Sequence, residues 1–65
     1  MSRVVVAPSG SQWTVKVNGV TKSNHRKKRR AVDEGRKQAL RVGATLEVRR
    51  RNGTVQNRIN PRGGR

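Results

Sequence analysis

The segment that decides the order of the fold reads QWTVKVNG and covers residues 12–19. Apolar and polar side chains alternate along its first six residues, with the tryptophan and both valines on one face, as in a half-buried strand. The final Asn-Gly pair tolerates the positive φ of a type I′ turn, which makes it the strongest short signal for a hairpin. We therefore expect a strand over residues 12–17 that turns back into a strand over residues 20–24.

On the N-terminal side of this hairpin, residues 3–7 read RVVVA, a run rich in β-branched side chains. The run ends at the cluster Pro8-Ser9-Gly10-Ser11, whose residue types favour turns. It predicts a further strand that precedes the hairpin.

On the C-terminal side, the apolar period changes from two residues to about four. Ala31, Gly35 and Ala39 are spaced four apart, which places them on one face of a helix. Gly43 falls where a left-handed C-cap belongs. The pattern predicts a helix over residues 27–42.

Alternation returns after the helix. Residues 45–51 and 54–59 each predict a strand, and Asn52-Gly53 between them predicts a second hairpin turn. The predicted architecture is α+β in the order β-β-β-α-β-β, a mostly antiparallel sheet with one helix packed on a face. Residues 1–60 would form one small domain, and residues 61–65 a flexible basic tail. The predicted core consists of Val4, Val6, Trp13, Val15, Val17, Val20, Ala31, Val32, Ala39, Leu40, Leu46, Val48, Val55 and Ile59.

The chain is short and strongly basic. Its 65 residues include 17 Lys and Arg against three acidic residues, so that the formal net charge is +14. A chain of this length buries only about 60% of its extended surface, and repulsion among the charges works against the compact state. We expect marginal stability at low salt, improved by a bound polyanion or by formation of a homodimer.

Composition also excludes several classes of site. The chain has no cysteine, so it can form neither a disulfide nor a thiolate metal site. With one histidine and three carboxylates, no metal site built by the protein is expected. We find no catalytic arrangement of side chains and no phosphate-binding glycine loop. The sequence predicts a protein that is not an enzyme and uses no cofactor.

The charge points to an anionic partner. By charge alone, nucleic acid is the most common partner of such a chain, followed by an anionic membrane and then an acidic protein. The helix stripe is narrow and rich in alanine, which makes membrane binding the least favoured. No apolar run approaches the ~20 residues of a membrane span. The apolar stretch near Met1 is too short for a signal peptide, and we expect a cytoplasmic protein.

Several short motifs, taken in order, resemble a known family, the domain of unknown function 2188 family of bacteria and their phages. The resemblance rests on VVVAP at 4–8, WTVK at 13–16, His25, Ala31, GATLEV at 43–48 and NGTVQ at 52–56. It implies a single sheet-plus-helix domain in the cytoplasm, in a bacterial nucleoid or a phage-infected cell, and it implies no catalytic residues. This chain is more basic than is usual in that family.

Five consecutive cations lie at the N-terminal end of the predicted helix, and we name them the helix-entry cluster: Arg26, Lys27, Lys28, Arg29 and Arg30. This end of a helix carries partial positive charge and unpaired backbone N–H groups, so cations are unfavourable there. A bound phosphate would relieve that conflict. We interpret the cluster as a contact to nucleic acid, the alternative being a solvated charge run.

A second group, the hairpin cluster, precedes the second predicted turn and consists of Arg49, Arg50 and Arg51, with Arg58 on the returning strand. Two-stranded ribbons fit the DNA major groove, where arginine is the preferred reader of guanine. The alternative is that these charges protect a sheet edge from aggregation. A single cation would serve that purpose, so we favour binding.

Four further cations extend the predicted contact surface: Arg36 and Lys37 on the helix, and Arg62 and Arg65 in the tail. The helical pair has another interpretation, because both could pair with the acidic residues one turn earlier. The tail would add affinity without sequence specificity.

The type of nucleic acid follows from the aromatic content. Trp13 is the only aromatic residue, and its valine neighbours predict that it lies in the core. Surfaces that stack unpaired bases use several aromatic side chains, so duplex DNA is favoured over RNA. The predicted function is an accessory protein that binds nucleic acid through phosphate contacts with low sequence specificity. The alternatives are a protein-interaction module, such as a phage product that binds an acidic host factor, and a protein associated with RNA or the ribosome.

Overall fold

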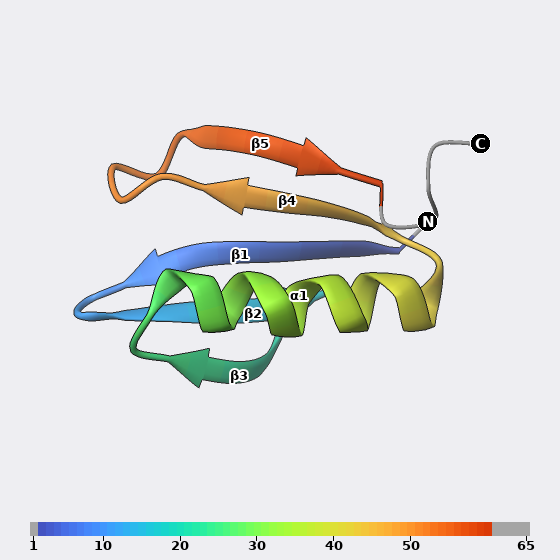
Figure 1. Ribbon diagram of the computed structural model, residues 1–65, viewed down its shortest axis with the longest axis horizontal. Coiled ribbons are helices and arrows are strands. Elements are labelled where there is room, and N and C mark those ends of the chain that lie inside the picture. The colour runs from blue at the N-terminus through green and yellow to red at the C-terminus, as the bar shows by residue number, and fades with distance from the viewer. Residues whose placement is uncertain (1, 61–65) are drawn as a thin grey trace.

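A computed structural model describes residues 2–60 and confirms the predicted order of elements (Figure 1). The elements are the strands β1 (Arg3–Ser9), β2 (Gln12–Val17) and β3 (Val20–His25), the helix α1 (Lys28–Val42), and the strands β4 (Thr45–Arg49) and β5 (Val55–Ile59). The tail predicted over residues 61–65 lies outside the described residues. No helix among residues 2–60 is long and apolar enough to cross a bilayer.

The five strands form one mixed sheet in the order β3-β2-β1-β4-β5. Neighbouring strands pair antiparallel except for β1 and β4, which pair in parallel from Arg3↔Thr45 to Val6↔Val48. The parallel pair follows from the connection, because α1 carries the chain from the β3 edge back across one face to a position beside β1 (Figure 1). The predicted sheet was mostly antiparallel, and the structure agrees.

The hairpin of β2 and β3 has the turn that its sequence predicts. Asn18 and Gly19 both adopt positive φ, 52° and 83°, as a type I′ turn requires. The side chain of Asn18 also accepts a hydrogen bond from the backbone N–H of Arg3, at 2.9 Å. The turn therefore ties β2 and β3 to the start of β1.

The helix approaches the sheet closely because the residues that it buries have small side chains or none. These residues are Ala31, Gly35 and Ala39. A Cβ atom on Gly35 would lie 2.8 Å from Cγ2 of Val6 and 2.9 Å from Cδ1 of Leu46, so only glycine fits without a shift. At the other end of α1, Gly43 has φ 70° and closes the helix as predicted.

The predicted core is largely confirmed but contains three errors. Val20 and Leu40 are each 57% exposed, and Val55 is 39% exposed. Leu40 follows the buried Ala39 and is rotated about 100° from it around the helix axis. Val20 lies at the start of the edge strand β3. The buried apolar residues are Val4, Val6, Trp13, Val15, Val17, Ala31, Ala39, Ala44, Leu46 and Val48, with Val32 and Ile59 packed against them.

Val55 is exposed because a bulge shifts its register. The irregularity lies between Val48 and Arg49, so that Val48 pairs with Asn57 whereas Arg49 pairs with Val55. A shift of one residue moves a side chain to the other face of the sheet. Val55 consequently shares the face of Arg49 rather than the face covered by α1.

Candidate nucleic-acid interface

The helix-entry cluster lies at an uncapped helix N-terminus. The N-cap residue is Lys27, in extended conformation, and no side chain caps the first turn. That turn holds no acidic residue, and the first carboxylate of the helix is Asp33. The predicted conflict between cations and the helix dipole is therefore present in the folded chain.

The hairpin cluster is split by the turn that follows β4. The predicted strand over residues 45–51 is too long, because β4 ends at Arg49. The backbone N–H of Gly53 donates to the carbonyl of Arg50 at 2.8 Å, and Gly53 has φ 91°. The side-chain oxygen of Asn52 accepts from the backbone N–H and hydroxyl of Thr54, at 3.1 and 2.7 Å. This geometry places Arg50 and Arg51 in the turn.

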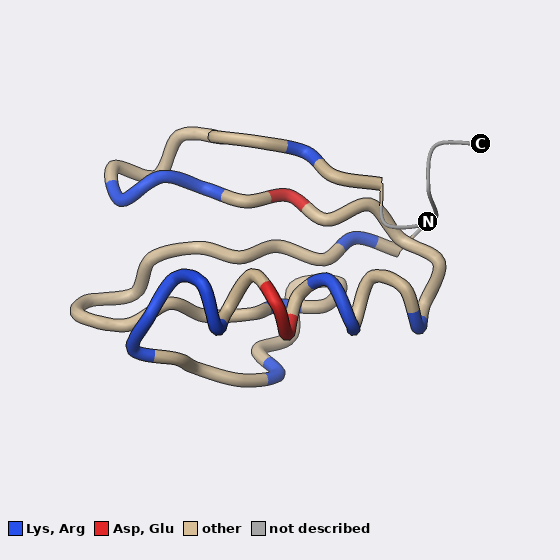
Figure 2. The backbone as a smooth tube through the Cα atoms, in the orientation of Figure 1, with Lys and Arg blue, Asp and Glu red and all other residues tan. Residues whose placement is uncertain are grey.

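The two clusters meet at one end of the molecule (Figure 2). Helix α1 begins at the end of the sheet where β4 turns into β5 (Figure 1). We name this surface the basic end; it consists of Arg26, Lys27, Lys28, Arg29, Arg30, Arg50 and Arg51. Of these, only Lys28 is half-buried and the others are exposed. The fold thus gathers cations that lie about twenty residues apart in the chain.

The ring of Trp13 contacts one cation from each cluster. Nζ of Lys28 is 5.1 Å from the ring centroid, and Cζ of Arg51 is 5.9 Å from it. Such cation–π contacts partly offset the repulsion between the two cations. Trp13 is 5% exposed, which confirms its predicted place in the core. Its contact with both clusters was not predicted, because that contact depends on the strand order and no local motif signals it.

Lys28 makes a second link across the basic end. Its ammonium donates a hydrogen bond to Oε1 of Gln56 on β5. The first turn of α1 is thereby connected to the edge strand as well as to Trp13. A single lysine joins three elements there.

Two arginines of the predicted site are engaged elsewhere. On the sheet face opposite α1, the carboxylate of Glu47 pairs with Arg49 at 2.8 Å and with Arg58 at 3.5 Å. Glu47 is 5% exposed. Burial by itself raises the pKa of Glu47, but the hydrogen bonds and charges of Arg49 and then Arg58 outweigh it and lower the pKa below 4.5. These arginines therefore differ from Arg50 and Arg51.

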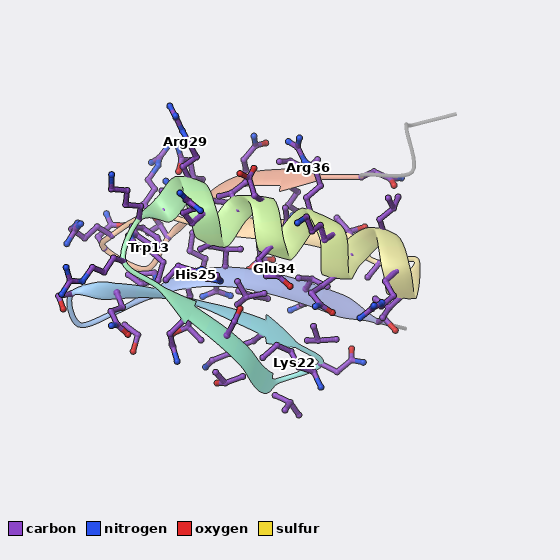
Figure 3. All side chains as sticks on the ribbon, turned by 60° about the horizontal axis from the view of Figure 1, so that its bottom comes forward. Trp13, Lys22, His25, Arg29, Glu34 and Arg36 are labelled. Carbon is purple, nitrogen blue, oxygen red and sulfur yellow. The ribbon has the colours of Figure 1, made fainter. Side chains whose placement is uncertain are left out.

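The remaining predicted residues occupy the outer helix surface or lie beyond the described part of the chain. Arg36 and Lys37 are exposed, and within residues 2–60 neither forms an ion pair with Asp33 or Glu34. Glu34 instead accepts a hydrogen bond from Gln38 at 2.9 Å. Arg29 and Arg36 extend from the same side of α1 (Figure 3). Arg62 and Arg65 lie outside the described residues.

Three polar residues of β3 form side-chain hydrogen bonds, one of them with β2. The hydroxyl of Thr14 donates to the side-chain oxygen of Asn24 at 2.7 Å, and Ser23 and His25 share a hydrogen bond of 3.0 Å. Thr14 was expected on the polar face, and its hydrogen bond explains how it is buried there.

Comparison with known proteins gives a family and no described activity. No curated protein and no solved structure matches the chain. A family model described as an uncharacterized protein conserved in bacteria, DUF2188, matches residues 3–60. That match spans every helix and strand of the fold. The chain therefore belongs to the DUF2188 family of bacterial proteins, as its motifs predicted.

Proposed function

We propose that this protein binds nucleic acid at the basic end, through phosphate contacts of low sequence specificity. The observation that carries the proposal is the convergence of two cationic segments, one from α1 and one from the β4–β5 turn, on the ring of Trp13. Among residues 2–60, the ion pairs are those of Glu47, and no cation of the basic end takes part in one. A surface with several unneutralised cations attracts a polyanion from a distance and holds it at contact.

Duplex DNA is the proposed partner ahead of RNA. Unpaired bases are recognised mainly by stacking on exposed aromatic rings. The only aromatic side chain of the protein is Trp13, and it is buried. Contacts to the backbone of a duplex require no exposed ring. The proposed role is that of a non-enzymatic accessory protein in the bacterial or phage-infected cytoplasm.

The direct test is a binding titration with duplex DNA, single-stranded DNA and duplex RNA of equal length, each over a series of salt concentrations. If most of the seven cations of the basic end contact phosphates, log affinity for duplex DNA falls with log salt at a slope of about −6. Affinity that is retained with a slope near zero contradicts phosphate contacts.

The same titration separates the competing functions. Tighter binding to duplex RNA than to duplex DNA at every salt concentration would favour an RNA-associated role. Absence of binding to all three polymers at low salt would leave an acidic protein partner as the better explanation of the charge. Capture of that partner from lysate would then resist nuclease treatment.

A further inference from the structure

Two cations of the basic end come from different elements and lie over one aromatic ring. Lys28 belongs to the first turn of α1 and Arg51 to the β4–β5 turn, yet both lie over the ring of Trp13. Their distances to the ring centroid are 5.1 and 5.9 Å, so the two charged groups are at most about 11 Å apart, the total of these distances. The hydrogen bond from Lys28 to Gln56 further limits where the ammonium can go.

An attractive interaction is needed to offset the repulsion between two cations that lie over one ring. Like charges repel, and no carboxylate among residues 2–60 pairs with Lys28 or Arg51. The negative face of the indole ring attracts both cations and offsets part of the repulsion. Because Trp13 is buried, its ring has a fixed position in the core. The ring therefore favours the position of the pair before any ligand arrives.

From this geometry we infer that Lys28 and Arg51 bind phosphates that lie close together on one nucleic-acid strand, and that Trp13 is the positioning residue for the pair. The inference rests on the proposed function and makes it more specific. Along one strand of B-DNA a phosphate occurs every ~3.4 Å of helix axis, so a pair at most 11 Å apart reaches phosphates only a few nucleotides from each other. The remaining cations of the basic end would contact the backbone on either side.

Replacing Lys28 or Arg51 should weaken DNA binding more than replacing a cation of equal charge elsewhere on the surface. Lys28 and Arg51 contact the ring, whereas Lys22 on β3 and Arg41 in the last turn of α1 are exposed and belong to other parts of the surface. Lys22 lies well away from Trp13 (Figure 3). The variants Lys28→Met and Arg51→Met therefore have matched controls in Lys22→Met and Arg41→Met, which remove the same charge.

The experiment uses a fluorescently labelled 16-base-pair DNA duplex, with its anisotropy reporting affinity and the emission of Trp13 reporting the site. The chain has one tryptophan and no tyrosine, so the protein emission comes from Trp13 alone. We expect Lys28→Met and Arg51→Met each to weaken binding about tenfold, as for loss of a charge-assisted hydrogen bond. Each control should weaken binding about threefold or less. Trp13 emission should change on binding in the wild type.

The outcomes separate the inference from the proposed function. If the wild type binds DNA but Trp13 emission stays constant at saturation, and the two variants match their controls, the inference is wrong and the proposed function stands. If the wild type does not bind DNA at low salt, both the inference and the choice of duplex DNA as the partner are wrong. All four substitutions are at exposed or half-buried positions, so each variant should still fold. Circular dichroism of each variant tests whether a loss of binding comes from a loss of folding.

Discussion

The carboxylate of Glu47 and the guanidinium of Arg49 form a 2.8 Å ion pair on the sheet face opposite α1, with Arg58 on the other carboxylate oxygen. These two ion pairs partly neutralise the charges of Arg49 and Arg58. Glu47, the one buried carboxylate among residues 2–60, thus helps to fix the start of the β4–β5 turn, since Arg49 also donates to the carbonyl of Gly53 at 3.4 Å.

The first prediction concerns the pH dependence of this ion pair. The pKa of Glu47 is lower in the folded than in the unfolded chain, so the folded state binds fewer protons. Its stabilising effect is complete above the unfolded pKa of about 4.5 and is lost as pH falls through the folded pKa. Thermal melts between pH 3 and 7 should show this loss. Glu47→Gln should reduce stability at pH 7 by about 1 kcal/mol and flatten the profile. An unchanged slope in that variant would contradict the role of Glu47.

The second prediction concerns Gly35. An added methyl group would stand 2.8 Å from Val6 and 2.9 Å from Leu46, and both neighbours are buried. Overpacking by one carbon costs about 1–3 kcal/mol, against a gain of about 1 kcal/mol in helix propensity. Gly35→Ala should therefore lower the melting temperature. Arg36→Ala, at the exposed neighbouring position, is the control and should leave it nearly unchanged; a more stable Gly35→Ala would show that α1 can move outward freely.

The third prediction is that one substitution has opposite effects on stability and binding. Lys27 is the N-cap residue and its side chain makes no cap hydrogen bond. Lys27→Asp should stabilise the protein by about 1 kcal/mol through capping and the helix dipole, and should weaken DNA binding. Lys27→Gln removes the charge without introducing a carboxylate, so it should weaken binding less and stabilise less. A melting temperature that falls in Lys27→Asp would argue against an uncapped helix start.

The fourth prediction concerns the salt dependence of DNA binding. Replacing Lys27, Lys28, Arg29 and Arg30 by glutamine should weaken binding to all sequences alike and reduce the salt slope by about 3 to 4. The matched control replaces four exposed cations elsewhere, namely Arg3, Lys16, Lys22 and Arg41. Both variants carry the same net charge. Equal salt slopes in the two would mean that net charge, rather than the basic end, governs affinity.

The fifth prediction concerns stability at low ionic strength. Exposed cations repel one another across a surface that holds few carboxylates, and salt screens this repulsion. The melting temperature should therefore rise between 10 and 300 mM salt, and it should rise further when duplex DNA is added at low salt. A melting temperature that moves with neither would contradict the expected marginal stability.

The sequence predicted the order of elements because the local signals were strong and agreed with one another. Asn18-Gly19 specifies a turn type on its own, and the spacing of Ala31, Gly35 and Ala39 specifies a helix face. Errors arose where a side chain depends on a partner strand. Val55 alternates correctly along its own strand, but a bulge against β4 places it on the other face.

The candidate site was predicted as two clusters and not as one surface. Their meeting over Trp13 depends on α1 returning the chain to the side of β1, and no local pattern encodes that strand order. For the same reason the sequence could not separate Arg49 from Arg51. The two lie two residues apart, yet one pairs with Glu47 and the other contacts the indole ring.

The parallel seam between β1 and β4 has a consequence for synthesis of the chain. The three strands up to His25 can pair as each is made, but the central strand β1 waits for its second neighbour until residues 45–49 have left the ribosome. Long-range parallel pairing of this kind is slow relative to hairpin closure. A nascent chain consequently exposes the unpaired edge of β1 until β4 pairs with it. Only then do the arginines of the β4–β5 turn come close to the cations at the start of α1.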